Sequence, residues 1–194
     1  MKNTFTKLFV GLLLIVGISI ISQSCKSSKK AATLKDQEET EISVLCAGGE
    51  YLSDAQRLRF SAVGESMDQM TSKKKALSEA RAGLASQMQT LIKGVIDNYL
   101  KSGEHNNKED LMERYEGLTR EVINQKLTGT RIICEKMTKT KTGNFKTYVC
   151  IELGGSELLQ SISNRLSNDE MLKIDYNYEK FKKTFEDEMN KQAQ

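Results

Sequence analysis

The chain has 194 residues, with 29 lysine and arginine side chains, 26 aspartate and glutamate side chains, four cysteines, one histidine, and neither proline nor tryptophan. Because the charges nearly balance and no basic stripe alternates with aromatic side chains, the composition argues against a nucleic-acid-binding protein. A single histidine excludes a zinc site built from histidines, and the cysteines lack metal-ligand spacing, so we expect no metal and no cofactor.

An apolar run occupies residues 8–21, and two lysines, Lys2 and Lys7, precede it. As a helix this run is about 21 Å long, short of the roughly 30 Å hydrocarbon core of a bilayer. A basic head, a short apolar middle and small residues at the end are typical of a secretory signal peptide, which we assign to residues 1–24. Simple secretion and an uncleaved membrane anchor stay open as alternatives.

Cys25 follows Ser24 directly at the end of this segment. The pattern resembles the lipobox of bacterial lipoproteins, whose cysteine is acylated and becomes the new N-terminus, although Ser22 stands where leucine is usual. The resemblance implies lipidation at Cys25 and attachment to the outer membrane, because several acyl chains together hold a protein firmly. Residues 25–40 then form a polar tether. This tether begins with Lys26 and not with an acidic cluster, which favours the periplasmic face.

The mature chain, residues 25–194, suits one domain with one sizeable core. Its first elements are short apolar stretches that indicate strands at residues 41–46 and 57–66. A long helix follows, which Thr71 or Ser72 is placed to cap and Gly103 to end. Apolar residues recur along this helix at steps of three and four and form one stripe, for which a sheet face is the natural partner: Leu77, Ala80, Leu84, Met88, Leu91, Ile92, Val95 and Tyr99.

The second half of the chain predicts a helix at residues 108–127 and then a hairpin at residues 131–153. A three-residue turn in that hairpin places Gly143 where a left-handed residue is required. Ser156 is placed to cap a short helix, and a charged helix covers residues 168–190.

The fold class that follows is α+β, a small and mainly antiparallel sheet with long helices packed on one face. We divide the chain after the tether into a domain at residues 41–166 and a C-terminal amphipathic helix at residues 167–194. The apolar seam of that helix either docks on its own domain or forms a partner or dimer interface. The seam consists of Ile174, Tyr178, Phe181, Phe185 and Met189.

Two stretches carry a family resemblance: "RLRFSAVGESMDQMTSKKKALSEARAGLASQMQTLIKGVIDNYL" and "TGTRIICEKMTKTKTGNFKTYVCIEL". The strand ending in "AVG", the alanine-rich helix and the closing hairpin resemble the membrane-associated lipoprotein family known from Helicobacter. They are also similar to the N-terminal domain of the flagellar T-ring assembly protein, and the whole chain resembles Bacteroidetes lipoproteins without an assigned function. The resemblance implies a sheet-plus-helix module at the cell envelope.

Three cysteines besides Cys25 remain, an odd number for an oxidising compartment. In the register of the predicted hairpin Cys134 faces Cys150, so a disulfide between these two is geometrically conceivable. The alternative is that both are small buried thiols that pack as hydrophobic side chains. Cys46, in the first predicted strand, has no assigned partner.

Catalytic motifs are missing from the sequence. His105 lies in the polar loop "SGEHNNKED", which indicates a solvated histidine, and no serine stands in a G-x-S-x-G elbow. The stretch "LGGSELL" lacks the G-K-[ST] end of a phosphate loop, so we interpret it as a capping turn. We therefore expect no enzyme, and a small hydrolase with an unfamiliar site stays a minor alternative.

Lys73, Lys74 and Lys75 lie in the first turn of the long helix, where cations oppose the helix dipole by ~0.3–1 kcal/mol each. Solvent and salt can absorb this cost. Alternatively the cluster faces an anion, such as a phospholipid head group, a lipid A phosphate or an acidic partner. We keep these lysines as candidate anion-binding residues.

The function expected from the sequence is that of an outer-membrane-anchored periplasmic lipoprotein, a structural or interaction module of the cell envelope. Its partners would be the membrane, through the N-terminal lipid, and an envelope protein or a second copy. The alternative is a periplasmic ligand-binding lipoprotein for a peptidoglycan fragment or a lipid.

Overall fold

The computed structural model describes residues 42–101, 108–174 and 176–192 of the chain. The unit that begins at Ser43 contains all the helices and strands discussed below. The predicted signal peptide and tether, residues 1–24 and 25–40, lie outside the described residues, and so do Cys25, Gly103 and His105.

Helices and strands follow one another in the predicted order, with one predicted strand missing. Their bounds are η2 (Gly49–Tyr51), β1 (Arg57–Ser66), α2 (Gln69–Lys101), α3 (Lys108–Thr128), β2 (Arg131–Lys139), β3 (Phe145–Gly154), α4 (Gly155–Asn168), η3 (Leu172–Ile174) and α5 (Tyr178–Gln192). Antiparallel strands with long helices confirm the predicted α+β class.

The strands form an antiparallel sheet in the order β1-β3-β2. β3 lies at the centre, and its residues 149–151 are all buried, as expected of a strand covered on both faces. Gly143 in the β2–β3 turn has a φ of 94°, which confirms the left-handed position assigned to it. Cys134 lies opposite Cys150 as predicted, and a bulge after Ile132 shifts the register farther along the hairpin.

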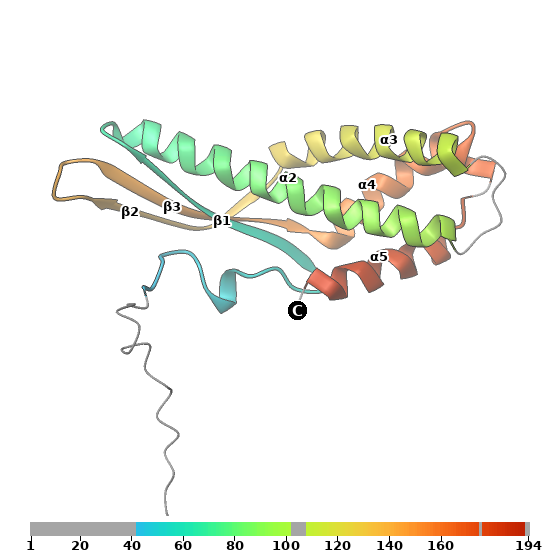
Figure 1. Ribbon diagram of the computed structural model, residues 1–194, viewed down its shortest axis with the longest axis horizontal. Helices are drawn as coiled ribbons and strands as arrows, with labels where there is room; N and C mark the ends of the chain where they lie inside the picture. Colours follow the sequence, from blue (N-terminus) through green and yellow to red (C-terminus); the bar gives the residue numbers. More distant parts are fainter. Residues whose placement is uncertain (1–41, 102–107, 175, 193–194) are drawn as a thin grey trace, which may run out of the picture. The chain divides into compact units, whose positions relative to one another are not determined.

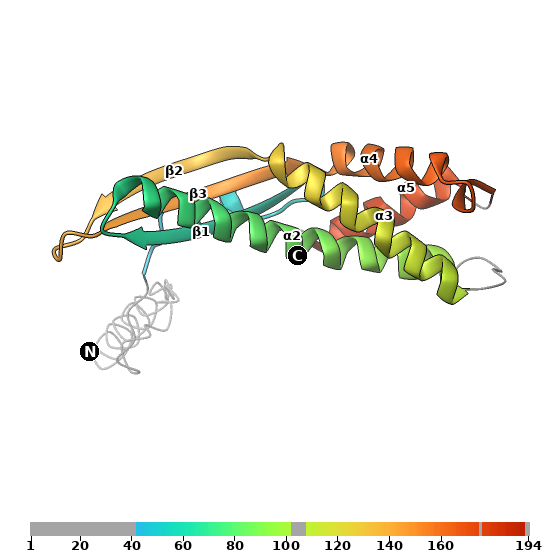
Figure 2. The same cartoon turned by 90° about the horizontal axis from the view of Figure 1, so that it is seen from above.

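α2 connects the two ends of this unit. Its 33 residues give it a length of about 50 Å at ~1.5 Å per residue. The first half of α2 packs on β1 and β3, and the second half passes beyond the sheet to pack beside α3 and α5 (Figures 1 and 2). The predicted stripe is buried along both halves, except that Leu77 is half-buried: Ala80, Leu84, Met88, Leu91, Ile92, Val95 and Tyr99.

Two glycines let the backbone of α2 and the sheet approach each other closely. A Cβ atom on Gly64 of β1 would lie 2.3 Å from the carbonyl oxygen of Ser72 and 2.4 Å from the backbone nitrogen of Ala76. A Cβ atom on Gly83 of α2 would lie 2.2 Å from the ring of Phe60 in β1. Both positions therefore require the absence of a side chain.

Beyond the sheet, aromatic side chains form the centre of the helical end. Ring centroids lie 6.4 Å apart between Tyr99 and Tyr115, and 5.4 Å apart between Tyr99 and Phe181, in edge-to-face arrangements. Phe181, Phe185 and Met189 of α5 are buried, and α5 packs on α2. Of the two roles considered for the terminal helix, docking on its own domain is the one that the structure shows.

The sheet face opposite α2 is partly covered by residues 43–56 (Figure 1). The hydroxyl of Ser61 donates to the carbonyl oxygen of Cys46 at 2.6 Å. The guanidinium of Arg59 donates to the carbonyl oxygen of Leu52 at 2.8 Å and to Glu152 at 2.8 Å. The bonds from Ser61 and Arg59, both on β1, satisfy two carbonyl oxygens of a segment that has no strand partner of its own.

The prediction of a strand at residues 41–46 is wrong over its described part, residues 42–46. Cys46 has a φ of 56°, and the backbone nitrogen of Ala47 donates to the carbonyl oxygen of Val44 at 3.3 Å. The left-handed conformation of Cys46 reverses the chain here, so these residues form a turn on the sheet face and not a strand.

The prediction that Thr71 or Ser72 caps the start of α2 is also wrong. The carboxylate of Asp68 accepts a hydrogen bond of 2.7 Å from the backbone nitrogen of Thr71, so Asp68 caps the helix. Ser72 is buried inside the helix and pairs with Thr147 of β3 at 2.7 Å.

Two helix starts in the C-terminal part differ from the prediction. Gly154 is the N-cap of α4 and no side chain caps that helix, so Ser156 does not have the capping role assigned to it. The last helix begins at Tyr178 and not at residue 168. Asp169 accepts backbone hydrogen bonds from Met171 and Leu172, which turns the chain between α4 and α5.

We expect Gly64→Ala to lower the free energy of unfolding by about 3 kcal/mol, because a new Cβ atom must push the α2 backbone off the sheet. Gly117→Ala in α3 is the matched control, since a Cβ atom there meets nothing within 4 Å. That control should raise the free energy by ~0.5–1 kcal/mol. Urea unfolding monitored by circular dichroism measures both, and equal effects would contradict the close approach of α2.

Candidate functional site

Three segments that are far apart in the sequence meet at one end of the sheet. In the β1–β3 register Ser66 lies opposite Phe145, and in the β2–β3 register Phe145 lies opposite Lys139. The end of β1, the start of α2 and the β2–β3 turn therefore lie together, as Figures 1 and 2 both show. We name this end, residues 64–75 and 136–147, the lysine-rich tip.

The lysine-rich tip carries more positive charge than the rest of the molecule. It contains seven lysines and two acidic residues, Glu65 and Asp68, whereas the rest of the chain contains 22 basic and 24 acidic side chains. Charge of one sign gathered on a surface produces a local potential even when the net charge is small. The basic character of this chain is therefore a local property of the tip.

The three lysines selected from the sequence lie in different surroundings. The ammonium of Lys73 lies 2.9 Å from the carboxylate of Glu135 on β2. Lys75 donates to the carbonyl oxygen of Glu65 on β1 at 3.1 Å. Lys74 is exposed and forms no salt bridge with the described residues. Adjacent residues of a helix do not face each other, so the run does not converge on one small anion.

The β2–β3 hairpin supplies further lysines that the sequence analysis did not select. Lys136, Lys139 and Lys141 are exposed, and the ammonium of Lys139 lies 5.2 Å from the centre of the Phe145 ring. The stretch "KMTKTKTGNFK" contains this signal, because a hairpin brings lysines on both sides of its turn to one end of a sheet. From the sequence, the stretch was interpreted only as the turn that sets the hairpin register.

The two carboxylates of the tip are held in their charged form. A hydrogen bond from the side chain of Asn144 is the main cause that lowers the pKa of Glu65. Hydrogen bonds from Thr71 lower the pKa of Asp68. Both groups therefore offset part of the lysine charge at neutral pH, and the surplus of lysines leaves the tip positive.

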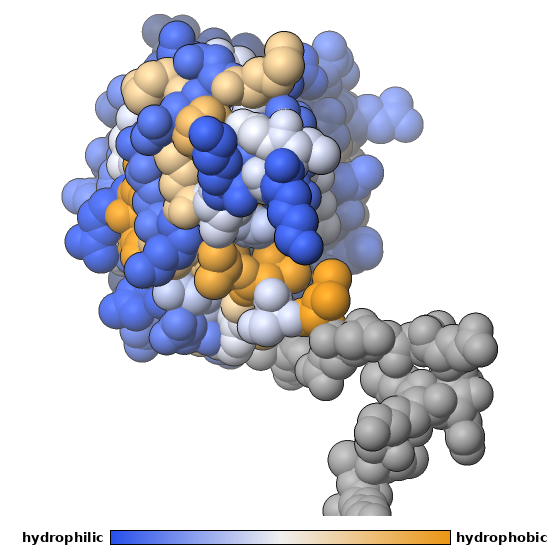
Figure 3. All heavy atoms as spheres, turned by 90° about the vertical axis from the view of Figure 1, so that its left-hand side faces the viewer, coloured by the Kyte–Doolittle hydropathy of each residue, from blue (hydrophilic) through white to orange (hydrophobic). Residues whose placement is uncertain are grey.

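Two apolar side chains stand out of the lysine-rich tip. Met67, between β1 and α2, is 84% exposed, and Met70, in the first turn of α2, is 58% exposed. Figure 3 looks onto this end of the molecule and shows apolar side chains among strongly hydrophilic ones. Exposed apolar groups ringed by charge are typical of an interaction surface.

The three described cysteines gather on the sheet face opposite α2. Neither interpretation of the pair Cys134 and Cys150 holds for both residues. The disulfide between them is not formed, because Cys134 is bonded to Cys46, whereas Cys150 is the free, buried thiol that the alternative expected. Cys134 and Cys150 do lie opposite each other. The partner that Cys134 takes instead, Cys46, belongs to residues 43–56. No local sequence pattern reveals where that segment lies on the sheet.

The Cys46–Cys134 disulfide joins residues 88 positions apart. In the chain-entropy account, closing a loop of that length raises the free energy of unfolding by about 4–5 kcal/mol. Burial raises the pKa of the Cys150 thiol. The thiol is therefore protonated at neutral pH and is a poor nucleophile.

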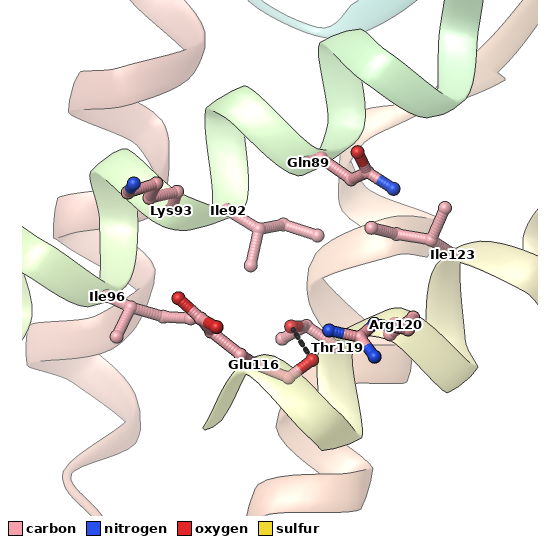
Figure 4. A pocket seen from close by; sticks show the side chains of 8 residues that line it. All are labelled: Gln89, Ile92, Lys93, Ile96, Glu116, Thr119, Arg120 and Ile123. Atoms are coloured by element: carbon pink, nitrogen blue, oxygen red, sulfur yellow. Dashed lines mark hydrogen bonds between the residues drawn. The ribbon is translucent and has the colours of Figure 1, made fainter. Parts of the chain in front are cut away.

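A hollow of about 230 Å³ lies between α2 and α3, and Figure 4 shows its side chains. Isoleucines form its floor and charged or amide groups its rim, and the one hydrogen bond drawn runs from the Thr119 hydroxyl to the Glu116 carbonyl oxygen. Its volume is below the ~300–1,000 Å³ usual for small-molecule sites. The lining residues are Gln89, Ile92, Lys93, Ile96, Glu116, Thr119, Arg120 and Ile123.

A larger hollow, of about 680 Å³, adjoins the start of α4 and includes the stretch that was compared with a phosphate loop. The backbone nitrogen of Gly155 already donates to the carbonyl oxygen of Gln56 at 2.8 Å. An amide that a phosphate would need is thus occupied, in agreement with the interpretation of this stretch as a structural turn.

A third hollow, of about 420 Å³, lies between residues 47–53, β1 and α2. Gln87 on its wall has a buried side-chain oxygen, and this is the only buried side-chain nitrogen or oxygen without a hydrogen-bond partner among the described residues. Arg59, Ser61 and Tyr51 also line it. An unsatisfied acceptor of this kind would be satisfied by a donor group of a ligand.

Within the described part of the chain, no three histidine, cysteine or acidic side chains are grouped as a metal would require. The helices of that same part include none that is both long and apolar enough to cross a bilayer. Comparison of the chain with models of protein families, with curated proteins and with solved structures gives no match.

Mass spectrometry of the unreduced protein should find a peptide that joins Cys46 to Cys134. Cys150 should react with iodoacetamide only after unfolding, because its thiol is buried and protonated. Cys46→Ala should lower the free energy of unfolding by ~2–5 kcal/mol. A peptide that joins Cys134 to Cys150 in the wild-type protein would contradict this assignment.

Proposed function

We propose that the protein is an outer-membrane lipoprotein, acylated at Cys25, that serves on the periplasmic face as a structural or interaction module of the cell envelope. The observation that carries the proposal is the N-terminal sequence. A basic head and the apolar run at residues 8–21 lead directly to Cys25, the order of parts in a cleavable, acylated signal segment. The resemblance to the membrane-associated lipoprotein family from Helicobacter points the same way.

An interaction role, and not an enzymatic one, agrees with the chemistry of the described residues. The ionisable groups of the lysine-rich tip lie on an exposed surface, whereas enzymes gather such groups in a closed cleft. Exposed lysines and two exposed methionines are suited to contact with another surface. In this account the tether, residues 25–40, holds the domain near the membrane.

Ligand binding is the second candidate function, and the hollow beside Gln87 favours it. A peptidoglycan fragment or a lipid head group carries N–H and O–H donors that would satisfy the buried oxygen of Gln87. Calorimetric titration with muropeptides would measure such binding, and Gln87→Leu should remove it if the hollow is the site.

We expect the protein to incorporate an alkyne fatty acid fed to the producing cells and to sediment with the outer membrane. Cys25→Ala should abolish both, because the acylated sulfur is then missing. Cys150→Ala is the matched control: it also removes one thiol and should keep the label. Wild-type protein that takes up no label and remains in the soluble periplasmic fraction would favour simple secretion and sink the proposal.

The same labelled strain gives a test of the interaction role. Crosslinking in whole cells, followed by capture of the chain through a C-terminal affinity tag, should yield a specific envelope partner or a second copy of the chain. Cys25→Ala should reduce the yield, since it removes the chain from the membrane surface.

A further inference from the structure

We propose that the lysine-rich tip contacts the surface of an anionic phospholipid bilayer, with Met67 and Met70 in the headgroup region and lysines beside the lipid phosphates. The inference rests on the membrane attachment proposed above, which would keep the domain close to a bilayer. It assigns a partner to a surface that the sequence marked only by Lys73, Lys74 and Lys75.

The apolar part of the contact comes from the connection between β1 and α2. Met67 and Met70 are 84% and 58% exposed, and Met67 lies in the short connection between the end of β1 and the start of α2. Methionine is unbranched and flexible, so it adapts to an irregular environment such as the lipid headgroup region. Transfer of both side chains out of water is favourable.

The charged part comes from two elements at the same end. Lys74 lies four residues after Met70, on the same side of α2, and it is exposed. Lys139 ends β2 and Lys141 lies in the turn that follows, which the strand register places beside the end of β1. Each lysine close to an anionic membrane contributes about fivefold to the partition coefficient.

The geometry favours a broad surface over a single anion. Lys73 and Lys75 are held by Glu135 and by the Glu65 carbonyl oxygen, on β2 and β1 respectively. The exposed lysines therefore do not surround one cavity, as a site for free phosphate would require. They lie on α2 and on the hairpin, at the same end of the sheet as the exposed methionines, an arrangement that a layer of negative phosphates matches in charge.

The absence of tryptophan from the sequence provides a reporter for this contact. In full-length Met67→Trp that also carries Cys25→Ala, so that no acyl chain attaches the protein to the vesicle, the indole is the only one. Brominated lipids should quench its fluorescence in vesicles that contain phosphatidylglycerol. Met171→Trp is the matched control, because Met171 is 54% exposed and belongs to the connection between α4 and α5. Its fluorescence should not change.

Lysine replacement tests the charge. In the Met67→Trp chain, Lys74→Gln, Lys139→Gln and Lys141→Gln together should weaken binding to the anionic vesicles by about 100-fold, and added salt should weaken it as well. The control replaces the exposed Lys101, Lys173 and Lys183 by glutamine, which changes the net charge equally and should leave binding within about twofold, since these lysines are distant from the tip.

Methionine replacement tests the apolar part. Met70→Ser should weaken the binding of the Met67→Trp chain to the same vesicles, whereas Met171→Ser should not. Circular dichroism of each variant verifies that the fold is retained, as expected for replacements of exposed side chains.

Three results would overturn the inference: no quenching of Met67→Trp in anionic vesicles, equal quenching in vesicles of phosphatidylcholine alone, or equal effects of the two lysine sets. Binding of inorganic phosphate at the tip without vesicle binding would also overturn it. These results are separate from the fate of Cys25. Quenching by the chain that lacks the fatty acid would support the tip contact whatever the wild-type protein carries at Cys25. Acylation of the wild-type protein without quenching at Met67→Trp would support the anchor and exclude the tip contact.

Discussion

The close contact between α2 and the sheet is the constraint on which the rest of this structure depends. Gly64 and Gly83 lack side chains where the helix and β1 meet, and a Cβ atom on either would overlap atoms of the other element. The contact fixes the direction of a helix of 33 residues. Because that helix is longer than the sheet, its second half becomes the support on which α3 and α5 pack (Figure 2).

The same contact places the lysine-rich tip. Asp68 caps α2 immediately after β1 ends, so the first turn of the helix must lie beside the last residues of that strand. The register of β3 then brings the β2–β3 turn to the same end. A surface assembled from three short segments results, and no segment carries its positive charge alone.

The two faces of the sheet differ in how they are held. On one face, apolar side chains of α2 cover Val149 and Ile151, and the packing is continuous. On the other face, residues 43–56 are attached by a disulfide and by hydrogen bonds from Ser61 and Arg59. If Cys25 carries the lipid as we propose, this second attachment is where a force on the tether would reach the domain.

Much of the fold could be predicted from the sequence because its signals are local. The strand at residues 57–66, the hairpin with its turn at Gly143 and the long helical stripe follow from periodicity and turn chemistry, which depend on neighbours a few residues away. The start of the last helix was placed too early, since Asp169 ends one helix and turns the chain through backbone contacts that its own sequence context does not reveal.

By itself, the sequence determined the α+β class, the hairpin register between its turn and Cys134, and the presence of a lysine run at residues 73–75. Only the tertiary structure decided that Cys46 and not Cys150 bonds to Cys134, and that Lys73 and Lys75 contact the Glu135 carboxylate and the Glu65 carbonyl oxygen. The physical reason is the same in each case. A disulfide and an ion pair depend on distances between segments, and those distances exist only after α2 and residues 43–56 have packed on opposite faces of the sheet.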